Sequence, residues 1–157
     1  MGTEAPGRGP EHEWHRTVAM QCNNRAWALS VQSRTPAEDL EMLTAAHTSA
    51  YHWGQIGTEL QRMRATMLVA EVQALVGSGA MAFRLASEMR DYFANRPDTP
   101  DWEHAFVHTI HAHAACAAGR LDEHRASYQQ ALLAIEGIAD PEDRAIVMQT
   151  FTQVPTP

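Results

Sequence analysis

Residues 114–138, AACAAGRLDEHRASYQQALLAIEGI, decide the fold class of this 157-residue chain. An Ala-rich run ends at Gly119, and in the run that follows it apolar residues recur every three or four positions. This spacing is typical of an amphipathic helix, and a glycine just after the last periodic residue is typical of a helix end. The stretch therefore predicts a hairpin of two helices joined by a tight turn.

A second segment of the same design lies 42 residues earlier, with Gly77 in the place of Gly119. Repeated helix–turn–helix units predict a solenoid in which neighbouring hairpins bury each other's apolar faces. Residues 114–138 resemble a tetratricopeptide repeat in three features: the Ala-rich first helix, the Gly-Arg-Leu-Asp-Glu turn and the Tyr-x-x-Ala-Leu pattern. The resemblance implies a tetratricopeptide-like hairpin array, which is degenerate here because the usual repeat is about 34 residues long.

Local sequence also marks the other helix boundaries. N-cap residues, two of them in capping boxes and three of them followed by proline, stand at Thr35, Thr58, Thr99 and Asp140. Glycines that end helices stand at Gly54, Gly77, Gly119 and Gly137. We predict an all-α fold of about seven helices, over residues 11–32, 36–53, 59–76, 79–95, 100–118, 121–136 and 141–152. No strand-like alternation bounded by turn residues is found.

Composition narrows the classes of protein and of partner. The formal net charge of −7 argues against nucleic-acid binding, which needs a basic surface. No apolar run is long enough to span a membrane, and the first residues lack the apolar stretch of a signal peptide, so we expect a cytoplasmic protein without a membrane partner. The two cysteines form no disulfide framework. We expect residues 1–10 to be a disordered lead-in, rich in Gly and Pro, and residues 11–157 to form one domain.

Three histidines in DWEHAFVHTIHAHAA, His104, His108 and His111, are the feature most suggestive of chemistry. Steps of four and three residues return to the same side of a helix, so their imidazoles form a stripe. Two histidines spaced this way can chelate one metal ion, and imidazole suits Zn, Cu, Ni and Fe. All three on one ion is harder, because the outer two are about 10 Å apart along the axis. The alternative is a polar, partly solvated helix face.

A fourth histidine, His47, lies in an otherwise apolar stripe of the second helix, one turn before Tyr51. Its commoner role is that of a core residue with a hydrogen bond. The functional hypothesis places His47 and Tyr51 opposite the stripe, with His47 as a further metal ligand. In a catalytic version His108 acts as ligand or general base, and Tyr51 donates to developing negative charge.

The sequence says less about the roles of the remaining histidines and of the tryptophans. His113 points almost opposite the stripe, and His52 is expected to lie at the helix C-terminus, where a positive charge is favoured. The sequence assigns no role to His12 or His15. The four tryptophans are expected to pack in the core or between hairpins. Trp102 begins the helix that carries the histidine stripe, so it could also line a pocket there.

A second resemblance covers about residues 11–152. The segments HRTVAMQCNNRAWALS, RTPAEDLEMLTAAHTSAYHWGQIGT and DWEHAFVHTIHAHA are similar to a family of small bacterial tetratricopeptide-like proteins whose biochemical function is not settled. The matching positions are Arg34, Thr35, Glu38, Asp39, Met42, His47, Ser49, Tyr51, His52 and Trp53. The chain departs from the family at Thr44, where the family has histidine, and in the histidines of the fifth helix. The resemblance implies a fold and not an activity.

Two functions from different classes remain open. The first is a histidine-lined pocket between helices that binds a transition metal or a small ligand, and the sequence does not decide whether it is an enzyme. The second is a non-catalytic protein-interaction module, because helical repeats commonly bind partners in a concave groove. Absence of lysine, and few polar residues other than histidine on the first helices, favour the pocket. Self-association as a homodimer is a third possibility, because the ends of a short array need covering.

Overall fold

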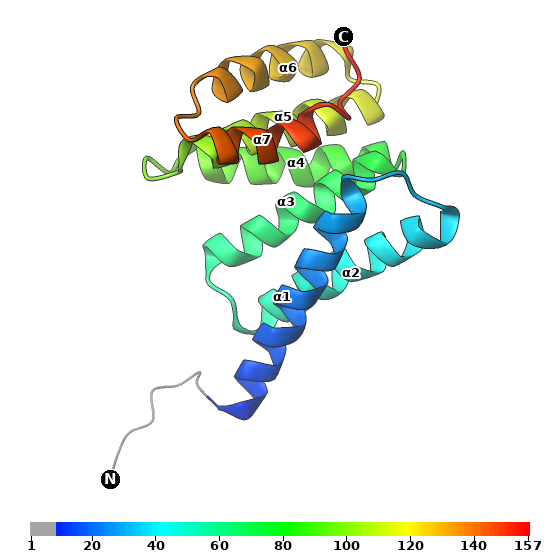
Figure 1. Cartoon of the computed structure of the whole chain (residues 1–157), viewed down its shortest axis with the longest axis vertical. Coiled ribbons are helices and arrows are strands. Elements are labelled where there is room, and N and C mark those ends of the chain that lie inside the picture. The colour runs from blue at the N-terminus through cyan, green and yellow to red at the C-terminus, as the bar shows by residue number, and fades with distance from the viewer. Residues whose placement is uncertain (1–8) are drawn as a thin grey trace.

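The computed structural model describes residues 9–157, which form seven α-helices and no strand (Figure 1). The helices are α1 (Pro10–Ser30), α2 (Pro36–Ile56), α3 (Glu59–Leu75), α4 (Gly79–Ala94), α5 (Asp101–Ala117), α6 (Leu121–Glu136) and α7 (Pro141–Phe151). The all-α prediction is confirmed, and each boundary lies within three residues of the expected one. None of these helices has the length and apolar character needed to cross a membrane.

Local capping explains where several helices begin. The Thr35 hydroxyl accepts a hydrogen bond from the Glu38 backbone N–H, and the Glu38 carboxylate accepts one from the Thr35 N–H, so both orphan donors are satisfied. Thr58 and Gln61 form the same reciprocal pair at α3. The Asp140 carboxylate accepts from two backbone N–H groups in the first turn of α7. Helix starts of this kind depend on neighbours in sequence, and for that reason they are predictable.

Three boundary predictions are wrong. Gly54 does not end α2, because the helix continues to Ile56 and Gly57 follows it; Gly54 lies on the exposed side with open space where a Cβ would be. Thr99 is not an N-cap, because Pro100 holds that position. Pro10 belongs to α1 and not to the expected lead-in, whose residues 1–8 lie outside the described part of the chain.

The two matching hairpins turn at matching glycines. Gly77 and Gly119 have φ angles of 80° and 71°, in the left-handed region where glycine carries no steric penalty. A further glycine, Gly79 at the start of α4, packs so close to the end of α5 that a Cβ there would collide with the Ala117 carbonyl. The small residues around these turns therefore bring α4 and α5 into close contact.

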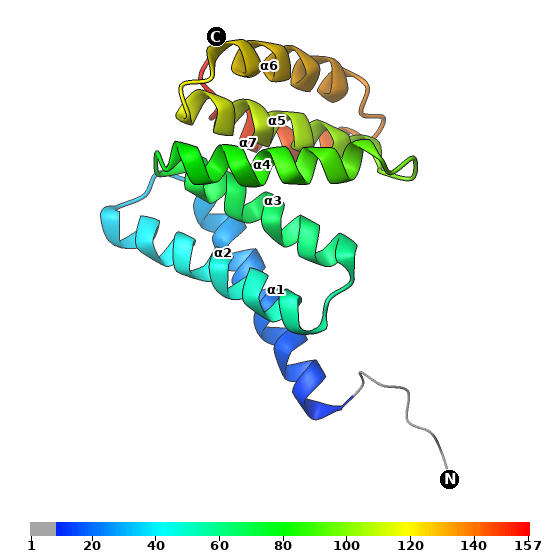
Figure 2. The same cartoon turned by 180° about the vertical axis from the view of Figure 1, so that it is seen from behind.

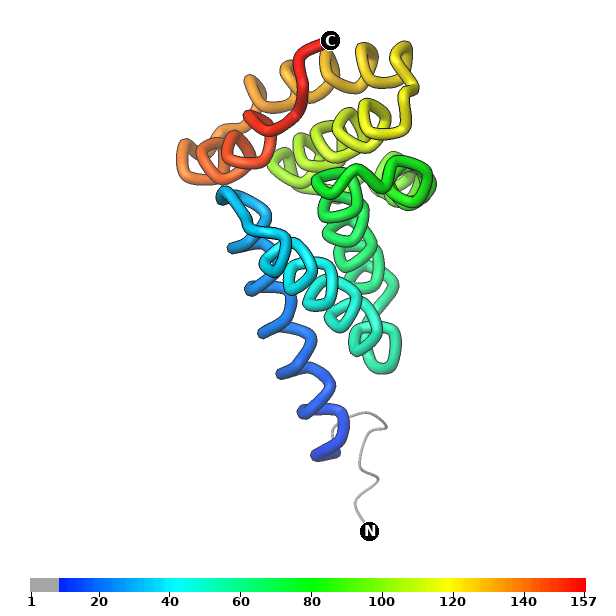
Figure 3. The backbone as a smooth tube through the Cα atoms, turned by 90° about the vertical axis from the view of Figure 1, so that its right-hand side faces the viewer, coloured from blue at the N-terminus to red at the C-terminus, as the bar shows by residue number. Residues whose placement is uncertain are grey.

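Each helix packs against its neighbour in the chain, and the odd-numbered helices also pack against one another. Each helix contacts the next, and α1, α3, α5 and α7 contact one another in succession. Figure 1 shows α1 and α7 towards the viewer, and in the reverse view of Figure 2 they lie behind α2, α4 and α6. Figure 3 shows α1 and α7 on one side of the molecule and α4 on the other. The odd-numbered helices thus share one side, and the core between them and the even-numbered helices is rich in alanine.

Candidate functional site

The histidine stripe exists on α5, but its members differ in exposure. His104 and His108 are half-buried, whereas His111 is fully buried. The stripe faces α4 and α6, because His111 contacts Ser87 of α4 and Ser127 of α6. The stripe therefore belongs to the packing between three helices.

The hydrogen bonds of His111 assign its tautomer. Its Nδ1 lies 2.7 Å from the Ser127 hydroxyl and 3.3 Å from Nη1 of Arg90. Because a guanidinium can only donate, Nδ1 must be the acceptor and Nε2 carries the proton. Nε2 then donates to the Ser87 hydroxyl, 3.4 Å away. Both ring nitrogens are thus satisfied inside the protein.

Burial and positive neighbours keep this part of the stripe neutral. Burial lowers the pKa of His111 to about 4, and the nearby Arg90 and His108 add to the effect. Burial also lowers the pKa of His108, with smaller contributions from His104 and Arg90. A buried neutral imidazole beside a buried serine has no access to a substrate, so the His111–Ser127 contact is a structural hydrogen bond.

A metal centre on the stripe gains no support from this arrangement. Within residues 9–157, no three or more His, Cys, Asp or Glu side chains are grouped so that they could hold an ion. Nδ1 of His111 is already bonded to Ser127 and faces Arg90, whose charge would repel a cation. The hypothesis that His104, His108 and His111 bind a transition metal stays a prediction.

The structure does not bring His47 and Tyr51 to the stripe. His47 is exposed on α2, and its Nε2 lies 2.9 Å from the side-chain amide of Gln73 on α3. Tyr51 is 63% exposed, and its ring lies edge-on against His52. The single pocket expected from these residues is therefore not formed, because α2 packs on α1 and α3 whereas the stripe faces α4 and α6.

His113 and His124 make structural contacts. His113 lies on another face of α5, as expected, with Nδ1 3.3 Å from the fully buried Glu71 carboxylate of α3. His124 Nε2 donates to the Pro155 carbonyl at 2.7 Å and so fixes the C-terminal segment on α6.

His52 lies towards the C-terminal end of α2, as expected, but it does not act there as the charged cap that the sequence suggested. It is buried, its Nδ1 lies 2.7 Å from Nδ1 of His15 on α1, and burial followed by the nearby His15 lowers its pKa. No sequence pattern indicated this pairing, because the two residues are 37 positions apart.

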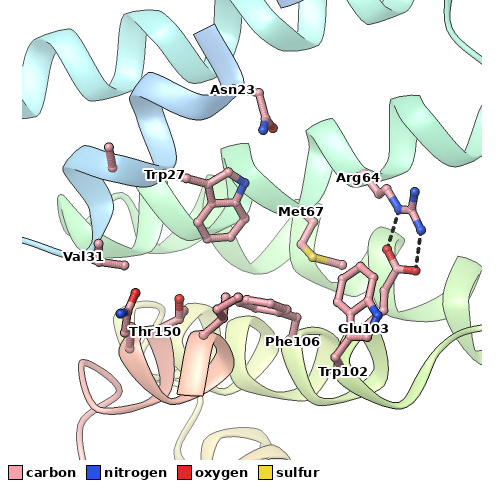
Figure 4. A pocket seen from close by; sticks show the side chains of 12 residues that line it. Asn23, Trp27, Val31, Arg64, Met67, Trp102, Glu103, Phe106 and Thr150 are labelled. Carbon is pink, nitrogen blue, oxygen red and sulfur yellow. Dashed lines mark hydrogen bonds and ion pairs between the residues drawn. The ribbon is translucent and has the colours of Figure 1, made fainter. Parts of the chain in front are cut away.

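A cleft of about 460 Å³ lies on the side of the molecule shared by the odd-numbered helices (Figure 4). It is lined by Asn23, Trp27, Ala28 and Val31 of α1, Arg64 and Met67 of α3, Trp102, Glu103 and Phe106 of α5, and Ile146, Gln149 and Thr150 of α7. We call this set the cleft. Its volume lies in the range of ordinary ligand and side-chain pockets, and its wall is mostly apolar.

Aromatic rings form the body of the cleft. The Phe106 ring lies 5.6 Å from that of Trp27 and 6.3 Å from that of Trp102, measured between centroids, and Met67 closes the space between them. The expectation that the tryptophans pack in the core or between hairpins is met by Trp27 and Trp102, which are half-buried against the core and also face the cleft. It is wrong for Trp14, which is 57% exposed. The aromatic rings provide a flat, rigid apolar surface for a ligand.

One charged pair stands at the edge of the cleft. Nε and Nη2 of Arg64 donate to the two Glu103 carboxylate oxygens at 2.6 and 2.9 Å, and the guanidinium lies 5.8 Å from the Trp102 ring centroid. The Glu103 side chain is only 2% exposed and the Arg64 side chain is 44% exposed. The hydrogen bonds with Glu103 raise the pKa of Arg64, so the guanidinium stays positively charged and its charge is balanced by the carboxylate it binds.

Polar side chains continue the cleft along α1 and α3. A neighbouring hollow of about 320 Å³ shares Asn23 and Arg64 with the cleft and adds Asn24 and Gln61. Contrary to the expectation from the sequence, the first helices of the hairpins therefore offer several polar groups besides histidine. No local pattern groups these polar side chains, because they come from two helices and lie about 40 residues apart along the chain.

Comparison of the chain with protein-family models, with curated proteins and with solved structures finds no match.

Proposed function

We propose that this chain is a non-catalytic binding protein, a tetratricopeptide-like helical array whose cleft holds a segment of a partner protein by one bulky apolar side chain. The observation that carries the proposal is the cleft itself, to which all four odd-numbered helices contribute. Arrays of helical hairpins commonly use such a concave side to bind partners.

The composition of the cleft selects the kind of side chain. The cleft contains aromatic residues and methionine, which are enriched in the cores of protein interfaces: Trp27, Trp102, Phe106 and Met67. Because Arg64 and Glu103 neutralise each other, the wall offers no net charge to attract a charged group. An aromatic or branched aliphatic side chain therefore fits the cleft best.

The rim of the cleft provides for the backbone of the same segment. Asn23 and Gln149 can each donate and accept hydrogen bonds, which a peptide backbone needs whatever its side chains are. An apolar centre with a polar rim is the usual anatomy of a protein–protein interface. These two amides support a peptide rather than a purely hydrocarbon ligand.

The test is selection from a random peptide library, followed by a variant that fills the cleft. Ala28 lines the cleft and is exposed, so Ala28→Trp should occupy the space with little strain in the core. Ala126→Trp, at an exposed position on α6, is the matched control. We expect wild type and Ala126→Trp to select the same peptides, enriched in one bulky apolar residue, and Ala28→Trp to bind them at least about tenfold more weakly.

Two results would contradict the proposal. The first is that selected peptides show no enrichment in bulky apolar residues. The second is that Ala28→Trp binds them as tightly as wild type, which would place the interaction on another surface. Far-UV circular dichroism of the two variants shows whether a loss of binding reflects a loss of fold.

A further inference from the structure

Two histidines from different helices face each other at the end of the molecule where α1 begins and α2 ends. Nδ1 of His15 lies 2.7 Å from Nδ1 of His52, and their ring centroids are 4.9 Å apart. Within residues 9–157 this is the one pair of histidine rings joined by a hydrogen-bonding contact. Neither Nδ1 has another partner among the described hydrogen bonds, so one of the two nitrogens donates to the other and no third group competes for them.

We propose that His15 and His52 form a binding site for a divalent transition metal such as Zn²⁺ or Cu²⁺, with both Nδ1 atoms as ligands and water in the remaining positions. Imidazole nitrogens bind Zn²⁺ at about 2.0–2.1 Å, so two of them at right angles around the ion lie about 2.9 Å apart. The observed separation is slightly shorter, because the two rings meet nearly head-on in a hydrogen bond. To admit the ion both rings turn so that each Nδ1 lone pair points at it, and the proton between the two nitrogens moves to an Nε2. A tetrahedral arrangement requires about 3.3 Å and a larger rotation of the same kind.

The surroundings favour a ligand pair. A Glu11 carboxylate oxygen lies 4.0 Å from Nε2 of His15, on the side of the ring away from His52. The distance is too long for a hydrogen bond, so the exposed carboxylate contributes negative charge near the pair, which favours a cation. The exposed rings of Trp14 and Tyr51 stand edge-on to His52 at 5.1 and 5.4 Å, and they cover most of the histidine pair, because His52 is 8% exposed and the His15 side chain 13%.

This site is separate from both the stripe and the cleft. His15 and His52 belong to α1 and α2, and neither lines the cleft. The inference therefore stands or falls independently of the proposed function. It also shifts the metal-binding expectation from a single helix to a pair of helices, where two ring nitrogens already converge.

The test is calorimetric titration of the tag-free chain with Zn²⁺. We expect one saturable site in wild type and more than about tenfold weaker binding in His15→Gln and His52→Gln, because each substitution removes one ligand. The matched control is His47→Gln, an exposed histidine of the same helix α2, which should bind Zn²⁺ as wild type does.

A second measurement avoids the histidine substitutions, in case these disturb the packing of α1 on α2. Cu²⁺ quenches the fluorescence of tryptophans close to it, and the Trp14 ring lies 5.0 Å from the His15 ring and 5.1 Å from the His52 ring. We expect saturable quenching in wild type and a much smaller fractional loss in Trp14→Phe.

Three outcomes would overturn the inference. Absence of saturable Zn²⁺ binding would show that His15 and His52 only share a hydrogen bond. Zn²⁺ binding that is equally tight in wild type, His15→Gln and His52→Gln would place the ion elsewhere, and a loss of that binding in His104→Ala/His108→Ala would then place it on the stripe. Quenching by Cu²⁺ that is the same in Trp14→Phe would also exclude the site.

Discussion

Acidification should destabilise the folded chain through His111 in a way that one substitution can isolate. The pKa of this imidazole is about 4 in the folded chain, against about 6.5 in an unfolded chain. Between pH 6.5 and pH 4 the imidazole of His111 is therefore protonated in the unfolded chain but mostly neutral in the folded chain. The stability that neutral His111 provides is complete above pH 6.5 and is lost as the pH falls towards 4.

The size of the loss follows from the two pKa values. One pKa unit corresponds to about 1.4 kcal/mol, and between pH 7.5 and pH 4.5 the linkage amounts to about 2.5 kcal/mol. His111→Gln removes the titrating group while it retains an oxygen acceptor for Ser127 and Arg90. We expect it to be less stable than wild type at pH 7.5 but to lose about 2.5 kcal/mol less on acidification.

Urea denaturation followed by circular dichroism at several pH values between 7.5 and 4.5 measures this difference. Carboxylates and the other histidines titrate in both proteins, so their contributions cancel in the comparison. His47→Gln, which changes an exposed ring, should follow the wild-type curve. Parallel loss of stability in wild type and His111→Gln would refute the argument that burial depresses this pKa.

Four further substitutions test the local arguments by the same denaturation assay. Thr35→Ala should cost about 1 kcal/mol, because it removes the side-chain half of a capping box; an unchanged midpoint would show that the cap contributes nothing. Gly119→Ala should lower the free energy of unfolding by about 1–2 kcal/mol, because Gly119 has a left-handed φ. Gly54→Ala should raise it by about 0.5–1 kcal/mol, because Gly54 lies on an exposed part of a helix with space for a Cβ. Effects of the same sign in the two variants would contradict this reasoning. Glu103→Gln should cost about 1–3 kcal/mol by removing the buried charge that Arg64 pairs with, and a neutral effect would show that the pair is fully screened.

Helix positions could be predicted because their causes are local. Caps such as Thr35–Glu38 and turns such as Gly119 involve residues within four positions of each other, and apolar periodicity covers a single helix. The misplaced end at Gly54 has the same origin, because a helix tolerates an exposed glycine when tertiary contacts of its other face hold it in place.

The function of each helix face was not predictable in the same way. Nearly every position of α5 from Ala105 to Ala115 is buried, so a helical wheel cannot separate a core face from a functional one. The stripe therefore contains a core histidine, His111, whose partners Ser87 and Ser127 lie on other helices.

The sequence by itself determined seven helices, their order and most of their limits, because capping and periodicity act over one or two turns. Only the tertiary structure decided that Trp27, Met67 and Phe106 share a cleft and that His15 meets His52. These groups lie about 40 residues apart along the chain, and the packing angles between helices set their distances. No local pattern encodes those angles, because they result from all the side chains in the interfaces at once.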